Sequence, residues 1–251
     1  MKKLLWLLLL AISFLAATSS AHAAIAFRKD CTPNNQSSNV ASLTVSCGTT
    51  TAGDLLVIVG AEYNSSSGAV TVACTDGTNT YTTLHAANAV FYCYATNIAG
   101  GTVTTTVTFT GGTTFCVCMG QEFSGVATSA AFDVGAFNNS IASCTACTMP
   151  AITTTQTGDL VLTSGGNGAT NNTFTNGTGY TISTNGQASG GNQSGAVEYQ
   201  TVGAATTYTP VLNITTGMAI TGYTISFFAG SALPATTIVP KTTVLPKTTA
   251  L

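Results

Sequence analysis

Cysteine is the residue type in this chain with the clearest chemical meaning. The chain has eight cysteines, an even number that predicts disulfide bonds if the protein is exported. Cys74 and Cys93 flank a turn between two expected strands, so we predict a bridge between them. Cys144 and Cys147 are close enough to close a small loop. The disulfide candidates are Cys31, Cys47, Cys74, Cys93, Cys116, Cys118, Cys144 and Cys147.

Cys116 and Cys118 are two residues apart, so both side chains leave the same face of a strand. We expect each of them to reach a cysteine on another strand rather than its neighbour. The alternative is a zinc site of four thiolates drawn from this pair and from Cys144 and Cys147. Disulfides are favoured in an oxidising compartment, and we therefore predict no metal site and no cofactor.

Three aspartates lie beside turn signals. Asp54 and Asp159 each follow a glycine and precede an apolar run, where a carboxylate can accept backbone N–H groups of the turn. A catalytic acid and base need two different environments, but these two share one local sequence. Asp76, in Asp76-Gly77-Thr78-Asn79, is also interpreted as a structural turn residue. A weak calcium site that uses Asp76 and a backbone carbonyl is the alternative.

Residues suited to catalysis are sparse. His85 is the only histidine outside the expected signal peptide, and no Gly-x-Ser-x-Gly motif accompanies it. We predict no catalytic residue and no enzyme activity. The tyrosines could stack on sugar rings if exposed, although core and cross-strand packing is their commoner use in strands. The eight tyrosines are Tyr63, Tyr81, Tyr92, Tyr94, Tyr180, Tyr199, Tyr208 and Tyr223.

The first residues have the pattern of a secretory signal peptide, which we assign to 1–23. Lys2 and Lys3 precede an apolar run, and Ala21-His22-Ala23 is a small-x-small cleavage site. No later stretch is long and apolar enough to span a bilayer. The expected location is therefore extracellular or at the cell surface.

Charge is scarce, since only 6% of the residues are charged. Between Cys31 and Pro240 there is no lysine or arginine, and the acidic residues give this span a formal charge of about −7. Nucleic acid is held mainly through lysine and arginine contacts to phosphate, so the composition excludes an ordinary nucleic-acid binder. A neutral polymer or surface ligand is the expected partner. The oligomeric state is left open.

The elements that must position these residues are strands. Leu55–Val59 is apolar on both faces and predicts a buried strand. In 102–110 threonines alternate with Val103, Val107 and Phe109, which predicts one buried face and one solvated face. One such threonine ladder on one strand is too narrow to match a regular surface such as ice or a crystalline polymer. No stretch after the expected signal peptide repeats its apolar residues with the 3.6-residue period of a helix, so we expect almost no helix.

The chain also repeats itself. Gly53-Asp54-Leu55 returns as Gly158-Asp159-Leu160, and Phe123-Ser124-Gly125 returns as Phe228-Ala229-Gly230. We predict an all-β fold, a two-layer antiparallel β-sandwich of jelly-roll or immunoglobulin-like type, built from two related halves and stapled by disulfides. The sandwich covers 24–230, with halves of about 24–130 and 131–230. Two tandem immunoglobulin-like sandwiches are the alternative. We predict that residues 231–251 form a Pro/Thr-rich tail or linker.

Four phrases of the sequence resemble a module of exported bacterial proteins that is frequent in surface proteins of soil bacteria. The resemblance covers most of 42–230 and implies a β-sandwich at or outside the cell surface. That module has no assigned activity and no catalytic residues to carry over. Cys93 stands where an aromatic residue is usual. The phrases are Gly53-Asp54-Leu55-Leu56-Val57, Asp76-Gly77-Thr78-Asn79-Thr80-Tyr81-Thr82, Tyr92-Cys93-Tyr94-Ala95-Thr96-Asn97 and Glu122-Phe123-Ser124-Gly125-Val126.

These observations favour a non-catalytic, secreted or cell-surface module for adhesion, matrix or structural interaction. The alternative is a carbohydrate-binding, lectin-like module that uses tyrosines and is assisted by calcium at Asp76. An exposed row of tyrosines on one sheet would favour that alternative. A secreted hydrolase has the least support, because no acid, base and nucleophile come together in the sequence.

Overall fold

The computed structural model describes residues 22–35, 38–63, 71–85, 90–168, 172–190 and 192–231. Within these ranges every regular element is a β-strand, and the sheets are antiparallel, as predicted. No helix in the described ranges is long and apolar enough to cross a membrane. The expected signal peptide, apart from its last two residues, and the expected tail beyond Ser231 lie outside the described residues.

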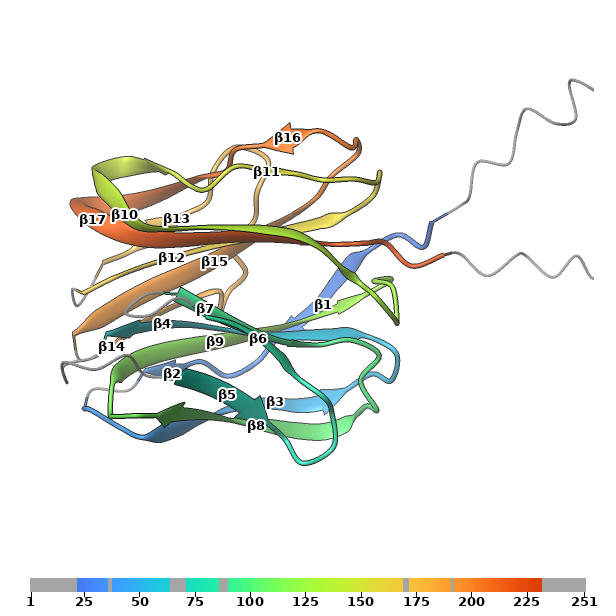
Figure 1. Ribbon diagram of the computed structural model, residues 1–251, viewed down its shortest axis with the longest axis horizontal. Helices are drawn as coiled ribbons and strands as arrows, with labels where there is room; N and C mark the ends of the chain where they lie inside the picture. The colour runs from blue at the N-terminus through green and yellow to red at the C-terminus, as the bar shows by residue number, and fades with distance from the viewer. Residues whose placement is uncertain are drawn as a thin grey trace, which may run out of the picture. The chain divides into compact units, whose positions relative to one another are not determined.

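The first half of the chain forms two sheets (Figure 1). A six-stranded sheet has the order β1-β9-β4-β7-β6, with β2 also paired to β9, and a three-stranded sheet has the order β3-β8-β5. The strands of the six-stranded sheet are β1 (Ala26–Asp30), β2 (Asn34–Asn35), β4 (Leu55–Tyr63), β6 (Thr82–His85), β7 (Val90–Ala95) and β9 (Phe115–Ser124). The three-stranded sheet contains β3 (Ser42–Thr50), β5 (Thr71–Thr75) and β8 (Gly101–Thr110).

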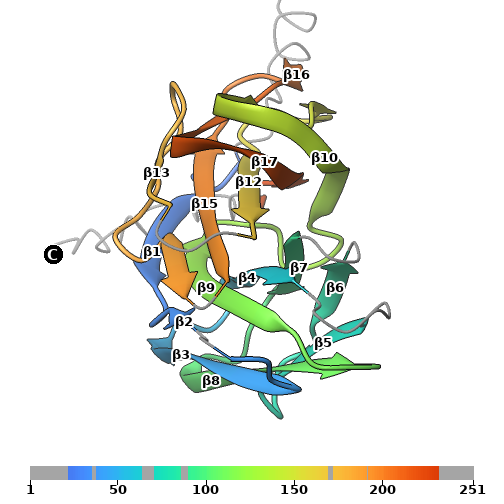
Figure 2. The same cartoon turned by 90° about the vertical axis from the view of Figure 1, so that its left-hand side faces the viewer.

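The second half forms another six-stranded sheet, of order β10-β17-β12-β15-β14 with β13 paired to β17, and a small sheet of β11 and β16. In Figure 2 the strands β10, β17, β12 and β15 follow one another across this sheet. The strands of the larger sheet are β10 (Phe132–Thr148), β12 (Leu160–Asn167), β13 (Phe174–Thr175), β14 (Gln187–Gly190), β15 (Gln193–Thr201) and β17 (Val211–Phe227). The small sheet pairs β11 (Ile152–Thr153) with β16 (Thr207–Tyr208).

The central strand β4 is buried on both faces, which its apolar sequence predicts. Val57 and Val59 pack toward the second half, in one core with Leu162 and Ile225. The alternate residues of β4, among them Ile58, pack toward the three-stranded sheet. The two six-stranded sheets therefore share one core face to face, and the three-stranded sheet covers the other side of the first.

The repeated Gly-Asp-Leu segment has the same structural role in both halves, where it forms the turn before a buried strand. Gly53 and Gly158 have φ values of +88° and +84°, a conformation that glycine adopts without a steric cost. In each half the leucine that follows starts a buried strand. Leu55 pairs with Phe123, and Leu160 pairs with Phe227. The prediction of two related halves is confirmed.

Three disulfides join the chain. Cys31–Cys47 joins the residue after β1 of the six-stranded sheet to β3 of the three-stranded sheet. Cys74–Cys93, the bridge that the sequence favoured, joins β5 of the three-stranded sheet to β7 of the six-stranded sheet. Cys144–Cys147 closes a short loop within β10. A native disulfide typically contributes about 2–4 kcal/mol to the free energy of unfolding. We therefore expect Cys31–Cys47 and Cys74–Cys93 to stabilise the first half considerably.

The threonine ladder of β8 differs from its prediction in one respect. Its alternation of exposed and buried residues is as expected. However, β8 is the middle strand of its sheet, with β3 on one side and β5 on the other. The exposed face is therefore three strands wide, which the sequence of one strand could not indicate.

Candidate functional site

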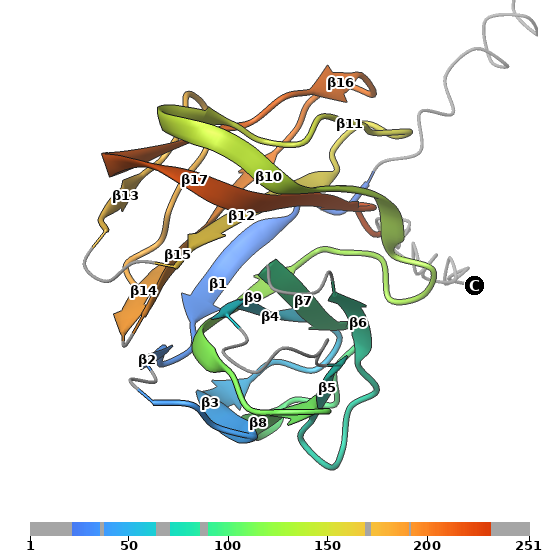
Figure 3. The same ribbon diagram turned by 60° about the vertical axis from the view of Figure 1, so that its left-hand side comes forward.

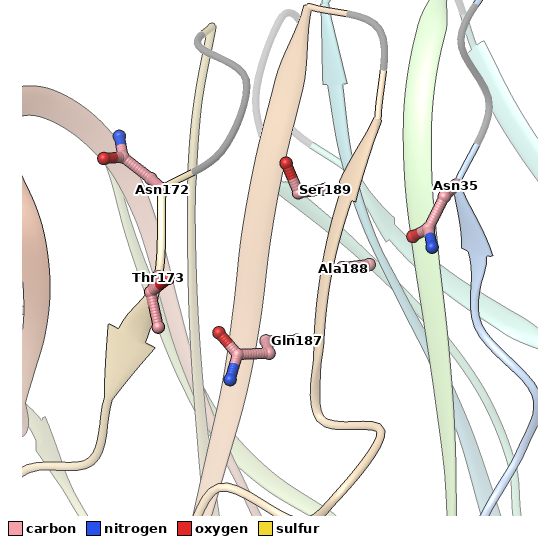
Figure 4. A pocket seen from close by; sticks show the side chains of 6 residues that line it. All are labelled: Asn35, Asn172, Thr173, Gln187, Ala188 and Ser189. Carbon is pink, nitrogen blue, oxygen red and sulfur yellow. The ribbon is translucent and has the colours of Figure 1, made fainter.

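A polar pocket of about 450 Å³ lies where β2 of the first half approaches β14 of the second (Figure 4). Its volume is within the range of small-ligand sites. β2 provides one wall, β14 the middle, and the segment that leads into β13 the opposite wall. The lining residues are Asn35, Asn172, Thr173, Gln187, Ala188 and Ser189.

Short contacts fix the walls of this pocket. The Gln187 side-chain oxygen accepts the Phe174 N–H at 3.1 Å, which ties β14 to β13. A Cβ atom added to Gly190 would lie 2.9 Å from the carbonyl carbon and oxygen of Asn35, so the close approach of β14 to β2 requires glycine. The pocket is thus defined by backbone that is already in place.

The lining of the pocket is uncharged. Amide side chains offer both donors and acceptors, and hydroxyls can act as either. None of the six lining residues is titratable. The pocket can therefore hold a neutral, hydroxyl-rich ligand by hydrogen bonds, and it lacks the acid and base that hydrolysis needs.

Asp54 directly precedes β4, and its hydrogen-bond partner is a side chain. The carboxylate accepts a hydrogen bond from Arg28 Nε at 3.0 Å. Burial raises the pKa of Asp54, the neighbouring Glu122 adds to the increase, and Arg28 opposes it. The Glu122 side chain accepts the Thr51 N–H at 2.6 Å. These carboxylates hold the turn before β4.

Asp159, the counterpart of Asp54, is fully buried. Burial and the nearby Asp133 carboxylate raise the pKa of Asp159 to about 6, while the backbone N–H groups of Gln156 and Ala229 oppose this increase. Asp133 is itself engaged by the Thr155 hydroxyl at 2.8 Å. The two carboxylates are packed within the fold.

Asp76 is the centre of a tight corner between β5 and β6. Its carboxylate accepts hydrogen bonds from the N–H groups of Thr78 and Asn79 at 2.8 and 2.7 Å and from the Tyr81 hydroxyl at 3.1 Å. Burial opposes ionisation, but the hydrogen bonds of Asn79 and Thr78 outweigh it and lower the pKa of Asp76. Both carboxylate oxygens are thus used by the turn.

The sequence did not indicate a contact between His85 and Glu62. His85 Nε2 lies 3.2 Å from Glu62 Oε1, and Thr114 donates its hydroxyl to Glu62 Oε2 at 2.9 Å. β6 and β4 both pair with β7, and this shared neighbour brings the two residues together. The Thr114 hydroxyl contacts the carboxylate and not the imidazole, so this is not a nucleophile with its base.

A second acid missed by sequence reasoning is Glu198 on β15, which is fully buried. Burial raises its pKa to about 7, although its Oε2 accepts the Gly177 N–H at 2.8 Å. Its Oε1 and the hydroxyl of Tyr180 are buried without a hydrogen-bond partner among the described atoms. Burial, with Glu198 adding to it, raises the pKa of Tyr180. The local sequence of β15 carries no signal of this environment.

Cys116 and Cys118 are buried free thiols whose sulfur atoms lie 2.9 Å apart. The expectation that each would reach a cysteine on another strand is wrong, because the other cysteines pair among themselves. Burial, with Cys118 adding to it, raises the pKa of Cys116 well above its usual value. Cys144 and Cys147 are bonded to each other and so cannot join these thiols in a zinc site.

The tyrosines do not form an exposed row in the part of the chain whose side chains are described. Tyr92 is fully buried. Tyr94 stacks on Phe132, and Tyr199 stacks on Phe27. The observation that would have favoured a tyrosine-based sugar platform is therefore missing among these residues, and the neutral pocket is the better candidate for a ligand.

No family model, no curated protein and no solved structure matches the chain.

Proposed function

We propose that this chain is an exported, non-catalytic β-sandwich module that attaches to neutral surfaces, for adhesion or as a structural part of an extracellular matrix. The observation that carries this proposal is the use of the acidic residues. All eight of them are buried or half-buried and none is exposed. Seven of them accept a hydrogen bond within the fold, and Asp159 is fully buried beside Asp133. The eight acidic residues are Asp30, Asp54, Glu62, Asp76, Glu122, Asp133, Asp159 and Glu198.

Catalysis by carboxylates needs an acid or base that can reach a substrate. Here the candidates are engaged: Asp30 accepts the Asn185 N–H at 3.0 Å, and Asp76 and Glu198 are held by the contacts already described. This argues for a structural role of the acids and against a hydrolase.

The exposed surface supports the same proposal. Among the charged residues that the structure describes, Arg28 is exposed, and it is paired with Asp54. Solvation comes instead from hydroxyl and amide side chains. Such a surface attaches to a partner by hydrogen bonding and packing rather than by opposite charge. The three disulfides are compatible with an oxidising, extracellular location.

The experiment is to incubate the exported chain with a panel of insoluble and soluble polysaccharides, with and without calcium, and to measure both retention and product release. We expect retention on at least one neutral insoluble polymer, no release of reducing ends, and no requirement for calcium. Release of sugar products would contradict the non-catalytic assignment. Absence of retention on every polymer would contradict attachment to neutral polysaccharide surfaces.

A second candidate function, carbohydrate binding, is favoured by the neutral pocket. Asn35 lines this pocket, and no hydrogen bond of its side chain within the described chain competes with a ligand. We expect Asn35→Ala to weaken binding of a soluble neutral oligosaccharide about tenfold, measured by titration calorimetry, because a hydrogen bond to the ligand is lost. Asn139→Ala, at an exposed position on β10, is the matched control. Equal affinities of the two variants would place the sugar elsewhere.

A further inference from the structure

The outward face of the three-stranded sheet is an array of hydroxyl groups, which we call the hydroxyl face. Figure 3 shows β3, β8 and β5 side by side at the edge of the molecule opposite β10 and β17. Three segments far apart in the sequence meet there. The hydroxyl face consists of Ser42, Thr44, Ser46 and Thr49 on β3, Thr102, Thr104, Thr106, Thr108 and Thr110 on β8, and Thr71 and Thr75 on β5.

The register of the sheet arranges these side chains in rows across the strands. Thr106 of β8 lies opposite Thr44 of β3 and Thr75 of β5. Thr104 lies opposite Ser46 in the next row. Neighbouring strands are about 4.8 Å apart, and residues on one face repeat about every 6.8 Å along a strand. The result is a two-dimensional grid of hydroxyls.

Burial of the other face fixes which way the pleat points. Val103, Val107 and Phe109 of β8 and Val45 of β3 pack into the core between the two sheets of the first half. A strand that shifted by one residue would place these side chains in water, so the hydroxyls cannot turn inward. Threonine is also restricted at χ1. The grid is therefore ordered before any partner arrives, which lowers the entropic cost of binding.

The hydroxyl face is uncharged and its side chains are largely free of partners within the described chain. Thr75 accepts the Gly77 N–H at 3.2 Å at one corner. The charged residues nearest the sheet are already engaged: Lys29 donates to the carbonyl oxygens of Cys47 and Thr49, and Asp76 is held by its turn. A charged ligand finds no complement here, but a neutral hydroxyl lattice finds both donors and acceptors.

We propose that the hydroxyl face binds the flat face of a crystalline, neutral polysaccharide. This inference rests on the proposed attachment function and names its partner. A single hydrogen bond between a protein hydroxyl and a sugar hydroxyl is weak when it is exposed to water, because water competes for both hydroxyl groups. A rigid lattice overcomes this limit, since it presents many hydroxyls at once and each bond formed makes the next one intramolecular. Threonine methyl groups and Ala73, which lies on the same face, can contact the C–H groups of the sugar rings.

The test measures the partition of the exported chain between buffer and microcrystalline cellulose or crystalline chitin. The test variant carries Thr104→Val, Thr106→Val and Thr108→Val, which remove hydroxyls but keep side-chain shape and strand propensity. The matched control carries Thr148→Val, Thr175→Val and Thr201→Val at exposed strand positions of the second half. We expect the control to bind like the natural chain, and the test variant to lose at least about tenfold in partition constant.

A second variant guards against a change in folding or in solubility. Thr106→Lys places a charge in the middle of the grid, where it must lose water against a neutral lattice, and Thr148→Lys is its control. Circular dichroism and urea midpoints establish that each variant is folded. A folded test variant that binds the crystals as tightly as the natural chain would overturn the proposal.

Other outcomes separate this inference from the proposed function. Retention of the natural chain on another neutral polymer, but not on either crystalline polysaccharide, would overturn the inference and leave the attachment function standing. Retention that survives in the valine variant but is lost in Asn35→Ala would assign the contact to the pocket. Uptake of the natural chain into growing ice, without retention on either crystalline polysaccharide, would show that the hydroxyl face binds ice. That result would overturn the proposal that it binds a polysaccharide.

Discussion

Replacing Glu198 by glutamine measures the protonation of the buried acid on β15. The carboxyl group is fully buried, and its Oε2 accepts the Gly177 N–H at 2.8 Å. Glutamine has nearly the same shape, its oxygen can keep that bond, and it carries no proton to lose. A difference between the natural chain and Glu198→Gln therefore isolates the ionisation of this one group.

The magnitude follows from the pKa. Burial raises the pKa of Glu198 from 4.5 to about 7. The folded chain thus holds the proton more tightly than the unfolded chain, so the free energy of unfolding falls as the pH rises from about 4.5 to about 7. A pKa difference of about 2.5 corresponds to roughly 3 kcal/mol. The Glu198→Gln chain does not lose this free energy of unfolding, because its residue 198 does not ionise. The raised pKa values of Asp159 and Asp54 affect both chains equally, so they cancel in the difference between the two chains.

The assay is urea unfolding followed by circular dichroism at pH 4 and pH 8, because the one tryptophan of the chain, Trp6, lies within the expected signal peptide. We expect Glu198→Gln to gain roughly 3 kcal/mol of stability relative to the natural chain between these pH values. A difference between the two chains that stays constant within about 1 kcal/mol would refute the assignment of a raised pKa to this buried carboxyl.

Two further predictions concern packing and thiols. A Cβ atom at Gly166 would lie 2.4 Å from the Ala61 Cβ, so Gly166→Ala should cost about 1–3 kcal/mol of stability in urea unfolding. Ala61→Gly in the same chain should recover part of this loss. Gly203→Ala, where nothing lies within 4 Å, is the control, and an equal loss there would contradict the packing argument. Cys116 and Cys118 are buried and free, so a thiol reagent should detect neither in the native chain and both after unfolding without reductant. Absence of thiols in the unfolded chain would mean that the pair is oxidised.

The sequence predicted the features of the fold that depend on neighbouring residues. An alternation with a period of two indicated the buried and exposed faces of β8, because successive side chains of a strand point to opposite sides. The repeated Gly-Asp-Leu segment indicated two related halves, because its glycine adopts a positive φ in both. Cys74–Cys93 was predictable because its two cysteines lie only 19 residues apart, on strands that flank the Asp76 turn.

The features that the sequence missed depend on which strands become neighbours. The hydroxyl face needs β3, β8 and β5 in one sheet, and their pairing is set by long-range packing. The contact between His85 and Glu62 joins two strands through a third. The pocket joins Asn35 to Gln187 across the two halves. No local pattern encodes such pairs, so a sequence alone cannot place them.

The central claim is that this chain attaches to neutral surfaces without using charge. The most direct measurement is the adsorption isotherm of the chain on an insoluble neutral polysaccharide at about 0.01 M and about 1 M salt. Between these concentrations the screening length of charges falls from about 30 Å to about 3 Å. The proposal predicts the same affinity at both salt concentrations. A loss of affinity of tenfold or more at high salt would show that charge carries the attachment and would contradict it.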